Sequence, residues 1–272
     1  MIGKPKFWTW SKIKLENCEM EVIQSRIIQL VSQVDICIFG HKTAELSEKL
    51  LRRIIDRDIC QLKTLKFEEF SILFSTSVDR DLLAEAITKV ETVRIKGMSS
   101  ETGRCIFSAV SSSLNMTLRS LSLTTGSTLC YDDNAGKAIV KLEEVSLCAT
   151  SLIPSQYESI FESIITCNDL KLKALHISHD NLSGVTTSSL VTAMSRLEAV
   201  SLCDTGLLPA QLTEMFKLVA KGNCSLRKLH LREINLSTVQ TELITQATSR
   251  LQVLELKPTK VKSKYSEPCR VT

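Results

Sequence analysis

The residues that come closest to a chemical site lie in the stretch HISHD at positions 176–180. His176, His179 and Asp180 are all of types that bind transition metals. The alternation of apolar and polar residues predicts a short strand, with His176 on one sheet face and His179 in the turn that follows. The two imidazoles then need not converge on one ion. We therefore expect surface histidines here, with no metal site and no cofactor.

Signatures of catalysis are absent from the sequence. Neither an HExxH nor a GxSxG motif occurs, and the nine glycines form no phosphate-binding loop. The ten cysteines are scattered and include no CxxC pair, so we expect reduced, core-like residues rather than a disulfide framework. We predict that the protein is not an enzyme and has no small-molecule substrate.

Composition is that of an ordinary soluble protein, with 43% hydrophobic and 24% charged residues among 272. A net charge of +4 is too small to indicate a nucleic-acid or membrane partner. The N-terminal residues lack the apolar run of a signal peptide, and we expect a cytoplasmic protein. A secreted, glycosylated protein is the alternative, because four N-x-S/T sequons occur, at Asn115, Asn181, Asn223 and Asn235.

An internal repeat is the strongest feature of the sequence. The phrase LEEVSLCATSLIPSQ at 142–156 returns as LEAVSLCDTGLLPAQ at 197–211, about 55 residues further on. Both copies contain an apolar skeleton L-x-x-L-x-L that continues in weaker form along the whole chain. The skeleton begins at positions 10, 34, 62, 90, 118, 142, 172, 197, 226 and 251. Such a period indicates a repeat architecture.

Each unit predicts a strand followed by a helix. Val200 and Leu202 alternate with Ser201 and Cys203, which is typical of a strand with one buried face. Residues 209–221 then place apolar side chains at helical spacing, namely Leu212, Met215, Phe216 and Val219. Strands pack about 4.8 Å apart and helices about 10 Å apart, so a stack of such units must bend with its sheet on the inner side.

The skeleton resembles leucine-rich repeats of the ribonuclease-inhibitor-like class over residues 10–257. The resemblance implies an α/β solenoid of about ten units, with a curved parallel sheet on the concave side and helices on the convex side. It departs at the turn position where such repeats often carry Asn; this chain has Thr150, Asp180, Thr205 and Ile234 there. We expect residues 1–9 to form an N-terminal extension or cap and residues 258–272 to form a basic, disordered tail.

The solvent-facing strand positions give the candidate partner-binding residues. Basic side chains lie towards both ends of the array and small ones in the middle, which would suit a protein surface with acidic edges. The residues are Lys66, Arg94, Lys96, Ser122, Ser146, His176, Ser201, Lys228, His230 and Arg232. The alternative is an ordinary solvated strand face. The concave positions hold no aromatic residues for base stacking, so we do not expect nucleic acid.

We therefore predict a non-enzymatic protein–protein recognition module that binds its partner through the concave face. The resemblance implies the ligand-sensing or autoinhibitory part of a larger intracellular receptor, as in NOD-like receptors, or of an adaptor. The alternative function is a regulator of an enzyme, such as an activator of Ran-type GTPases or a ubiquitin-ligase substrate adaptor. The sequence does not decide between them, because a fold does not fix a function.

Overall fold

The computed structural model describes residues 12–15, 36–39, 44–56, 62–67, 77–97, 99–125 and 132–257. The expected N-terminal cap (1–9) and basic tail (258–272) lie outside these residues. One parallel sheet contains ten strands, which lie side by side in chain order. The strands are β1 (Lys12–Leu15), β2 (Ile36–Phe39), β3 (Thr64–Phe67), β4 (Thr92–Lys96), β5 (Ser120–Thr124), β6 (Glu144–Cys148), β7 (Ala174–Ser178), β8 (Ala199–Cys203), β9 (Lys228–Arg232) and β10 (Val253–Lys257).

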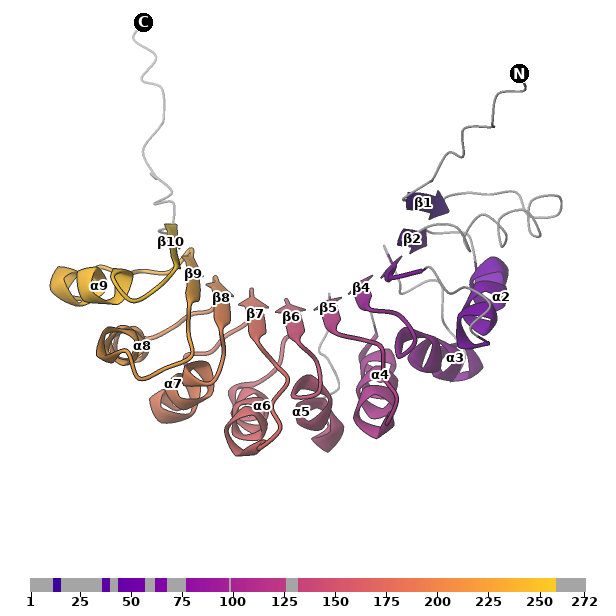
Figure 1. Ribbon diagram of the computed structural model, residues 1–272, viewed down its shortest axis with the longest axis horizontal. Helices are drawn as coiled ribbons and strands as arrows, with labels where there is room; N and C mark the ends of the chain where they lie inside the picture. The colour runs from indigo at the N-terminus through magenta and orange to yellow at the C-terminus, as the bar shows by residue number, and fades with distance from the viewer. Residues whose placement is uncertain are drawn as a thin grey trace, which may run out of the picture.

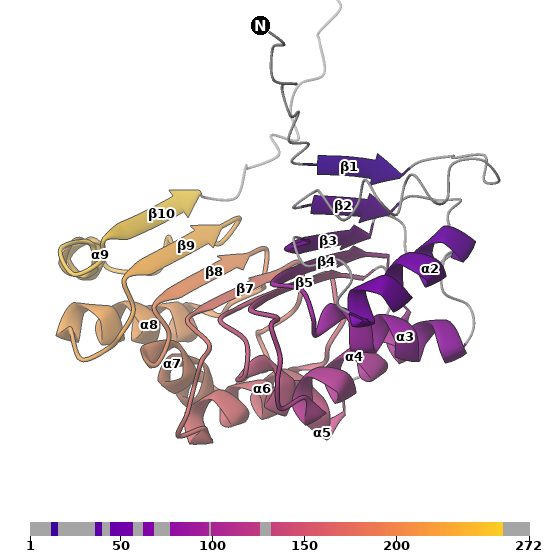
Figure 2. The same ribbon diagram turned by 45° about the vertical axis from the view of Figure 1, so that its right-hand side comes forward.

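Helices cover one face of this sheet and leave the other open (Figures 1 and 2). They are α2 (Ala44–Ile55), α3 (Ser77–Ile87), α4 (Ser100–Ser112), α5 (Asp133–Ile139), α6 (Pro154–Thr166), α7 (Thr187–Ser195), α8 (Pro209–Lys221) and α9 (Thr241–Thr248). Figure 1 shows the strands along the inner side of an arc and the helices along its outer side. The predicted alternation of strands and helices, with a single parallel sheet, is confirmed.

The skeleton positions mark the strands with a constant offset. Each strand begins two residues after one of the predicted starts, as Thr64 follows position 62 and Ala199 follows position 197. Within each strand, alternate side chains point toward the helices. In β8, for example, Val200 and Leu202 are each 1% exposed. Together with the inner faces of the helices they form one aliphatic core that runs the length of the array. Burying each such side chain contributes about 2 kcal/mol.

Long and short helices alternate in the C-terminal half, which explains the repeat of about 55 residues. Helices α4, α6 and α8 have 13 residues each, whereas α5, α7 and α9 have 7, 9 and 8. A basic side chain at the end of a short helix reaches the last carbonyls of the preceding long one. Arg196 donates from Nη2 to the Cys167 carbonyl at 2.7 Å, and Lys141 donates from Nζ to the Ser113 carbonyl at 3.3 Å. These contacts satisfy helix-terminal acceptors that otherwise lack partners.

Buried Thr and Asp side chains occupy the turns after several strands. The residue after the strand adopts a left-handed conformation in several units, as in Ala149 (φ 51°) and His179 (φ 57°). The next position is buried in the four units from β6 to β9: Thr150 0%, Asp180 5%, Thr205 0% and Ile234 4% exposed. Asp180 accepts hydrogen bonds from the Thr150 amide (3.1 Å), the Thr150 hydroxyl (3.0 Å) and the Ser151 amide (2.7 Å). Asp180 thus links the turns of two successive units.

No helix of the described residues is long and apolar enough to span a bilayer.

Candidate functional site

The candidate site is the open face of the sheet, which consists of the strand side chains that point away from the helices. Strand pairing arranges these side chains in rows that cross the strands. The middle row runs from β3 to β10 through Lys66, Arg94, Ser122, Ser146, His176, Ser201, His230 and Glu255. Seven of the ten predicted residues therefore lie in one unbroken row. The other three flank it, with Lys96 and Arg232 at the carboxyl ends of β4 and β9 and Lys228 at the amino end of β9.

At the N-terminal end of this row, three cations lie close together. Lys66 pairs laterally with Arg94, and Lys96 lies two residues further along β4 on the same face. Lys66 is half-buried, whereas Arg94 and Lys96 are exposed. None of the ion pairs within the described residues includes any of the three.

At the C-terminal end, the cations surround a carboxylate that the sequence reasoning missed. Glu255 lies next to His230 in the middle row and accepts hydrogen bonds from Arg232 Nη2 (2.9 Å) and His230 Nδ1 (2.7 Å). Lys257 Nζ lies 2.9 Å from its other oxygen. Hydrogen bonds from Arg232, then Lys257 and His230, lower the pKa of Glu255 to about 2. The same contact raises the pKa of Arg232 above its usual value.

Near the middle of the row, a second carboxylate contacts a histidine. His176 Nε2 lies 3.3 Å from Glu144 Oε1, and the Ser120 hydroxyl donates to the other oxygen of Glu144 at 3.3 Å. Burial lowers the pKa of His176 despite the opposing effect of Glu144, and the positive charge of nearby His230 lowers it further. His176 is therefore mostly neutral at neutral pH. Period-two alternation does place Glu144 and Glu255 on the open face, so both could have been included from the sequence.

The HISHD residues separate as predicted. His176 lies on the open face, His179 contacts Asp204 (Nδ1 to Oδ2, 3.2 Å), and Asp180 turns inward to the hydrogen bonds described above. Among the described residues, no group of three His, Cys, Asp or Glu side chains could hold a metal ion.

The thiols of the described cysteines Cys105, Cys148, Cys167, Cys203 and Cys224 are all free. Two of them, Cys148 and Cys203, lie at the carboxyl ends of open-face strands. Burial raises the pKa of the Cys203 thiol, which disfavours the reactive thiolate.

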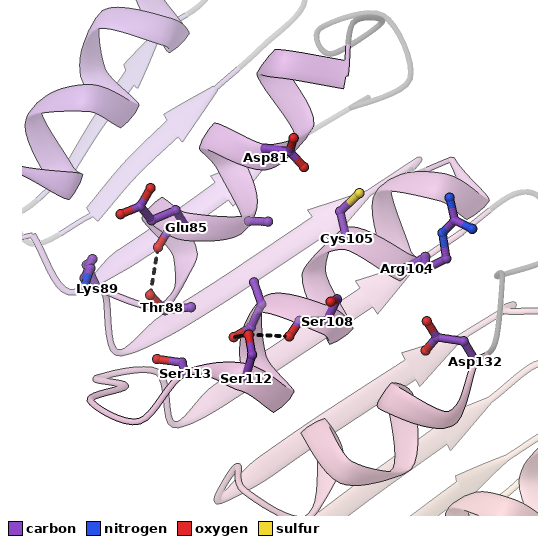
Figure 3. A pocket seen from close by; sticks show the side chains of 12 residues that line it. Asp81, Glu85, Thr88, Lys89, Arg104, Cys105, Ser108, Ser112, Ser113 and Asp132 are labelled. Carbon is purple, nitrogen blue, oxygen red and sulfur yellow. Dashed lines mark hydrogen bonds between the residues drawn. The ribbon is translucent and has the colours of Figure 1, made fainter.

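A groove on the helical side is a competing location. It lies beside α3 and α4, has a volume of about 520 Å³, and is shown in Figure 3. Acidic Asp81, Glu85 and Asp132 and basic Lys89 and Arg104 line it together with Cys105. Its charges are mixed and its polar side chains come mainly from exposed helix positions. None of the ten predicted residues lines this groove.

Comparison with protein-family models gives no match, and no curated protein gives a significant match.

Proposed function

We propose that the chain is a leucine-rich-repeat solenoid of the ribonuclease-inhibitor-like class, with about ten units. Its role is non-enzymatic recognition of a protein partner through the concave, open face of the sheet, as the ligand-sensing or autoinhibitory part of a larger receptor or adaptor. The observation that carries this proposal is the unbroken middle row from Lys66 to Glu255.

The size of the face supports a macromolecular partner. The middle row crosses eight strands, β3 to β10, and at about 4.8 Å per strand it is about 34 Å long. Strands of five residues make the face about 17 Å wide, so its flat area is about 600 Å², which approaches the roughly 800 Å² that each partner contributes to a typical protein interface.

The composition of the face supports specific binding with little adjustment of the main chain. Small side chains flank His176 in the centre of the row, where Ser122, Ser146 and Ser201 let a partner approach the sheet closely on either side of the imidazole. The main chain below them is held by the parallel ladder, so it loses little freedom on binding. The charged groups lie towards the two ends, where they would set the orientation of the partner.

The experiment blocks the face sterically without changing its charge. Ser146→Trp and Ser201→Trp each place a large ring in the middle row. Ser155→Trp is the matched control, because Ser155 is exposed on α6 on the other side of the molecule. Each variant and the wild type are used as bait in cell extract, and retained proteins are quantified by mass spectrometry.

A protein retained by wild type and by Ser155→Trp, and lost with both open-face variants, is the expected result. Circular dichroism melting of all four proteins shows whether the variants fold. If folded open-face variants retain the same proteins as the control, the concave face is not the binding surface.

A further inference from the structure

The N-terminal region of the open face, defined as the outward positions of β3, β4 and β5, contains cations and hydroxyls but no carboxylate. Its members are Thr64, Lys66, Thr92, Arg94, Lys96, Ser120, Ser122 and Thr124. Adjacent strands are about 4.8 Å apart and alternate residues about 6.8 Å apart, so the three cations share a small area. Like charges directly opposite each other on neighbouring strands destabilise a sheet. Lys66 beside Arg94 is such a pair, and an anion bound between them would relieve the repulsion.

Hydroxyl groups extend this region towards β5. Ser122 lies beside Arg94, and Thr124 lies beside Lys96. Both are half-buried, and neither side chain has a hydrogen bond within the described part of the chain. A carboxylate held by Arg94 or Lys96 could therefore accept a further hydrogen bond from β5. Charge-assisted hydrogen bonds of this kind are stronger than neutral ones.

Two carboxylates elsewhere on the open face disfavour binding of such an anion. Glu144 on β6 is exposed and occupied by His176 and Ser120, and it would repel an acid that extended past β5. Glu255 on β10 already accepts from three basic groups, so a second carboxylate there would compete for the same donors. Of the open-face basic residues on β9 and β10, Lys228 alone lies outside this cluster, so the open face favours acid mainly at its N-terminal end.

We propose that the partner contributes an acidic protein segment whose carboxylates bind Lys66, Arg94 and Lys96. The continuation of that segment is uncharged and crosses the small side chains Ser146 and Ser201 of β6 and β8. The inference rests on the proposed function and adds to it the charge of the partner and the end of the face that it occupies. A protein segment fits better than nucleic acid, because the open face of β3–β10 has no Phe, Tyr or Trp for stacking and its two carboxylates would repel phosphates.

The test measures binding of a short fluorescent peptide of alternating glutamate and serine by anisotropy. A peptide with glutamine at every glutamate and a single-stranded oligothymidylate are the comparison probes. One variant carries Lys66→Gln, Arg94→Gln and Lys96→Gln. The matched variant carries Lys228→Gln, Arg232→Gln and Lys257→Gln, which removes the same number of positive charges from the other end of the face. Melting curves check that both fold.

The expected result is that the first variant binds the acidic peptide about tenfold more weakly than wild type, a difference of about 1.4 kcal/mol, while the second changes less than twofold. Equal weakening by both variants, or none by either, would overturn the proposal, since the former indicates only long-range attraction. Tighter binding of the oligothymidylate than of the peptide would also overturn it. If the tryptophan variants abolish retention of a partner but the acidic peptide does not bind, the proposed function stands and this inference fails.

Discussion

The two ends of the open face both carry several basic residues, but these residues have different neighbours. The N-terminal region presents Lys66, Arg94 and Lys96 with no ion pair among the described residues. On β9 and β10, by contrast, Arg232, His230 and Lys257 all contact Glu255. A count of basic residues would rate the two regions alike. Basic side chains are therefore available to a partner only where no neighbouring carboxylate already binds them.

Register creates this difference. A carboxylate in the middle row lies about 4.8 Å from the side chains on the next strand, well within the reach of Arg and Lys. Glu255 occupies that position beside His230, whereas the position beside Arg94 on β5 is Ser122. Replacing one residue type in one row therefore changes which end of the face can attract an acid.

Both ends of the open face belong to one continuous sheet. Of the substitutions considered, Asp180→Ala is expected to destabilise that sheet most. Asp180→Ala leaves the amides of Thr150 and Ser151 without their acceptor beneath the turn between β6 and α6. Each buried group left unpaired costs about 1–3 kcal/mol, so we expect a loss of about 3 kcal/mol in the free energy of unfolding. Urea denaturation monitored by circular dichroism measures it.

Asp180→Asn is the control, because it keeps one carbonyl acceptor and nearly the same shape. It should lose clearly less stability than Asp180→Ala. Equal midpoints for Asp180→Ala and wild type would mean that the turns of neighbouring units are not coupled through this side chain.

The sequence predicts the strands of this fold well because their signal is periodic and local. The spacing of Val200 and Leu202 fixes both the strand and its buried face, and stacking of equal units leaves a parallel sheet as the arrangement that buries those faces. The turn chemistry was less certain from sequence. That Asp180 accepts hydrogen bonds from two amides of the preceding unit depends on the three-dimensional register, which the sequence pattern does not contain.

The candidate site could be predicted in position but not in charge balance. Alternation along each strand places Lys66, His176 and His230 on the open face, and the structure puts them in one row. The ion pairs of Glu144 and Glu255 were missed because they join residues on neighbouring strands. Such contacts depend on side-chain directions between units, which a one-dimensional pattern does not contain.

Glu255→Gln makes the C-terminal end of the open face resemble the N-terminal end, because it removes the carboxylate. Arg232 and Lys257 would lose their shared carboxylate and become available to an external acid. Because the pKa of Glu255 is about 2, the carboxylate that the variant removes is fully ionised at neutral pH. Exposed ion pairs are weak because water screens them, so we expect the acidic peptide to bind only about threefold more tightly. Anisotropy titration at neutral pH measures the change.

The matched control is Glu233→Gln, which removes one negative charge from an exposed turn residue directly after β9. If this variant tightens binding as much as Glu255→Gln, net charge alone explains the effect. The distinction between the two ends of the face would then have no basis in their ion pairs.

His176 lies between the two regions and gives the smallest expected effect, which depends on pH. Because burial lowers its pKa in the folded protein, the unfolded chain takes up a proton first as the pH falls through about 6.5. The stability that neutral His176 contributes is therefore complete above that pH and is lost on acidification towards the folded-state pKa. Glu144 on β6 and His230 on β9 act on it in opposite directions, and burial outweighs the attraction of Glu144.

Urea denaturation at pH 7.5 and pH 5.5 measures this loss in wild type and in His176→Gln. We expect the variant to lose less stability than wild type between the two pH values, because it lacks the imidazole whose pKa is lowered by burial. An equal or larger loss in the variant would mean that the ion pair with Glu144 outweighs burial. In that case protonated His176 would neutralise Glu144, and the repulsion between Glu144 and an acidic segment of the partner would weaken as the pH falls.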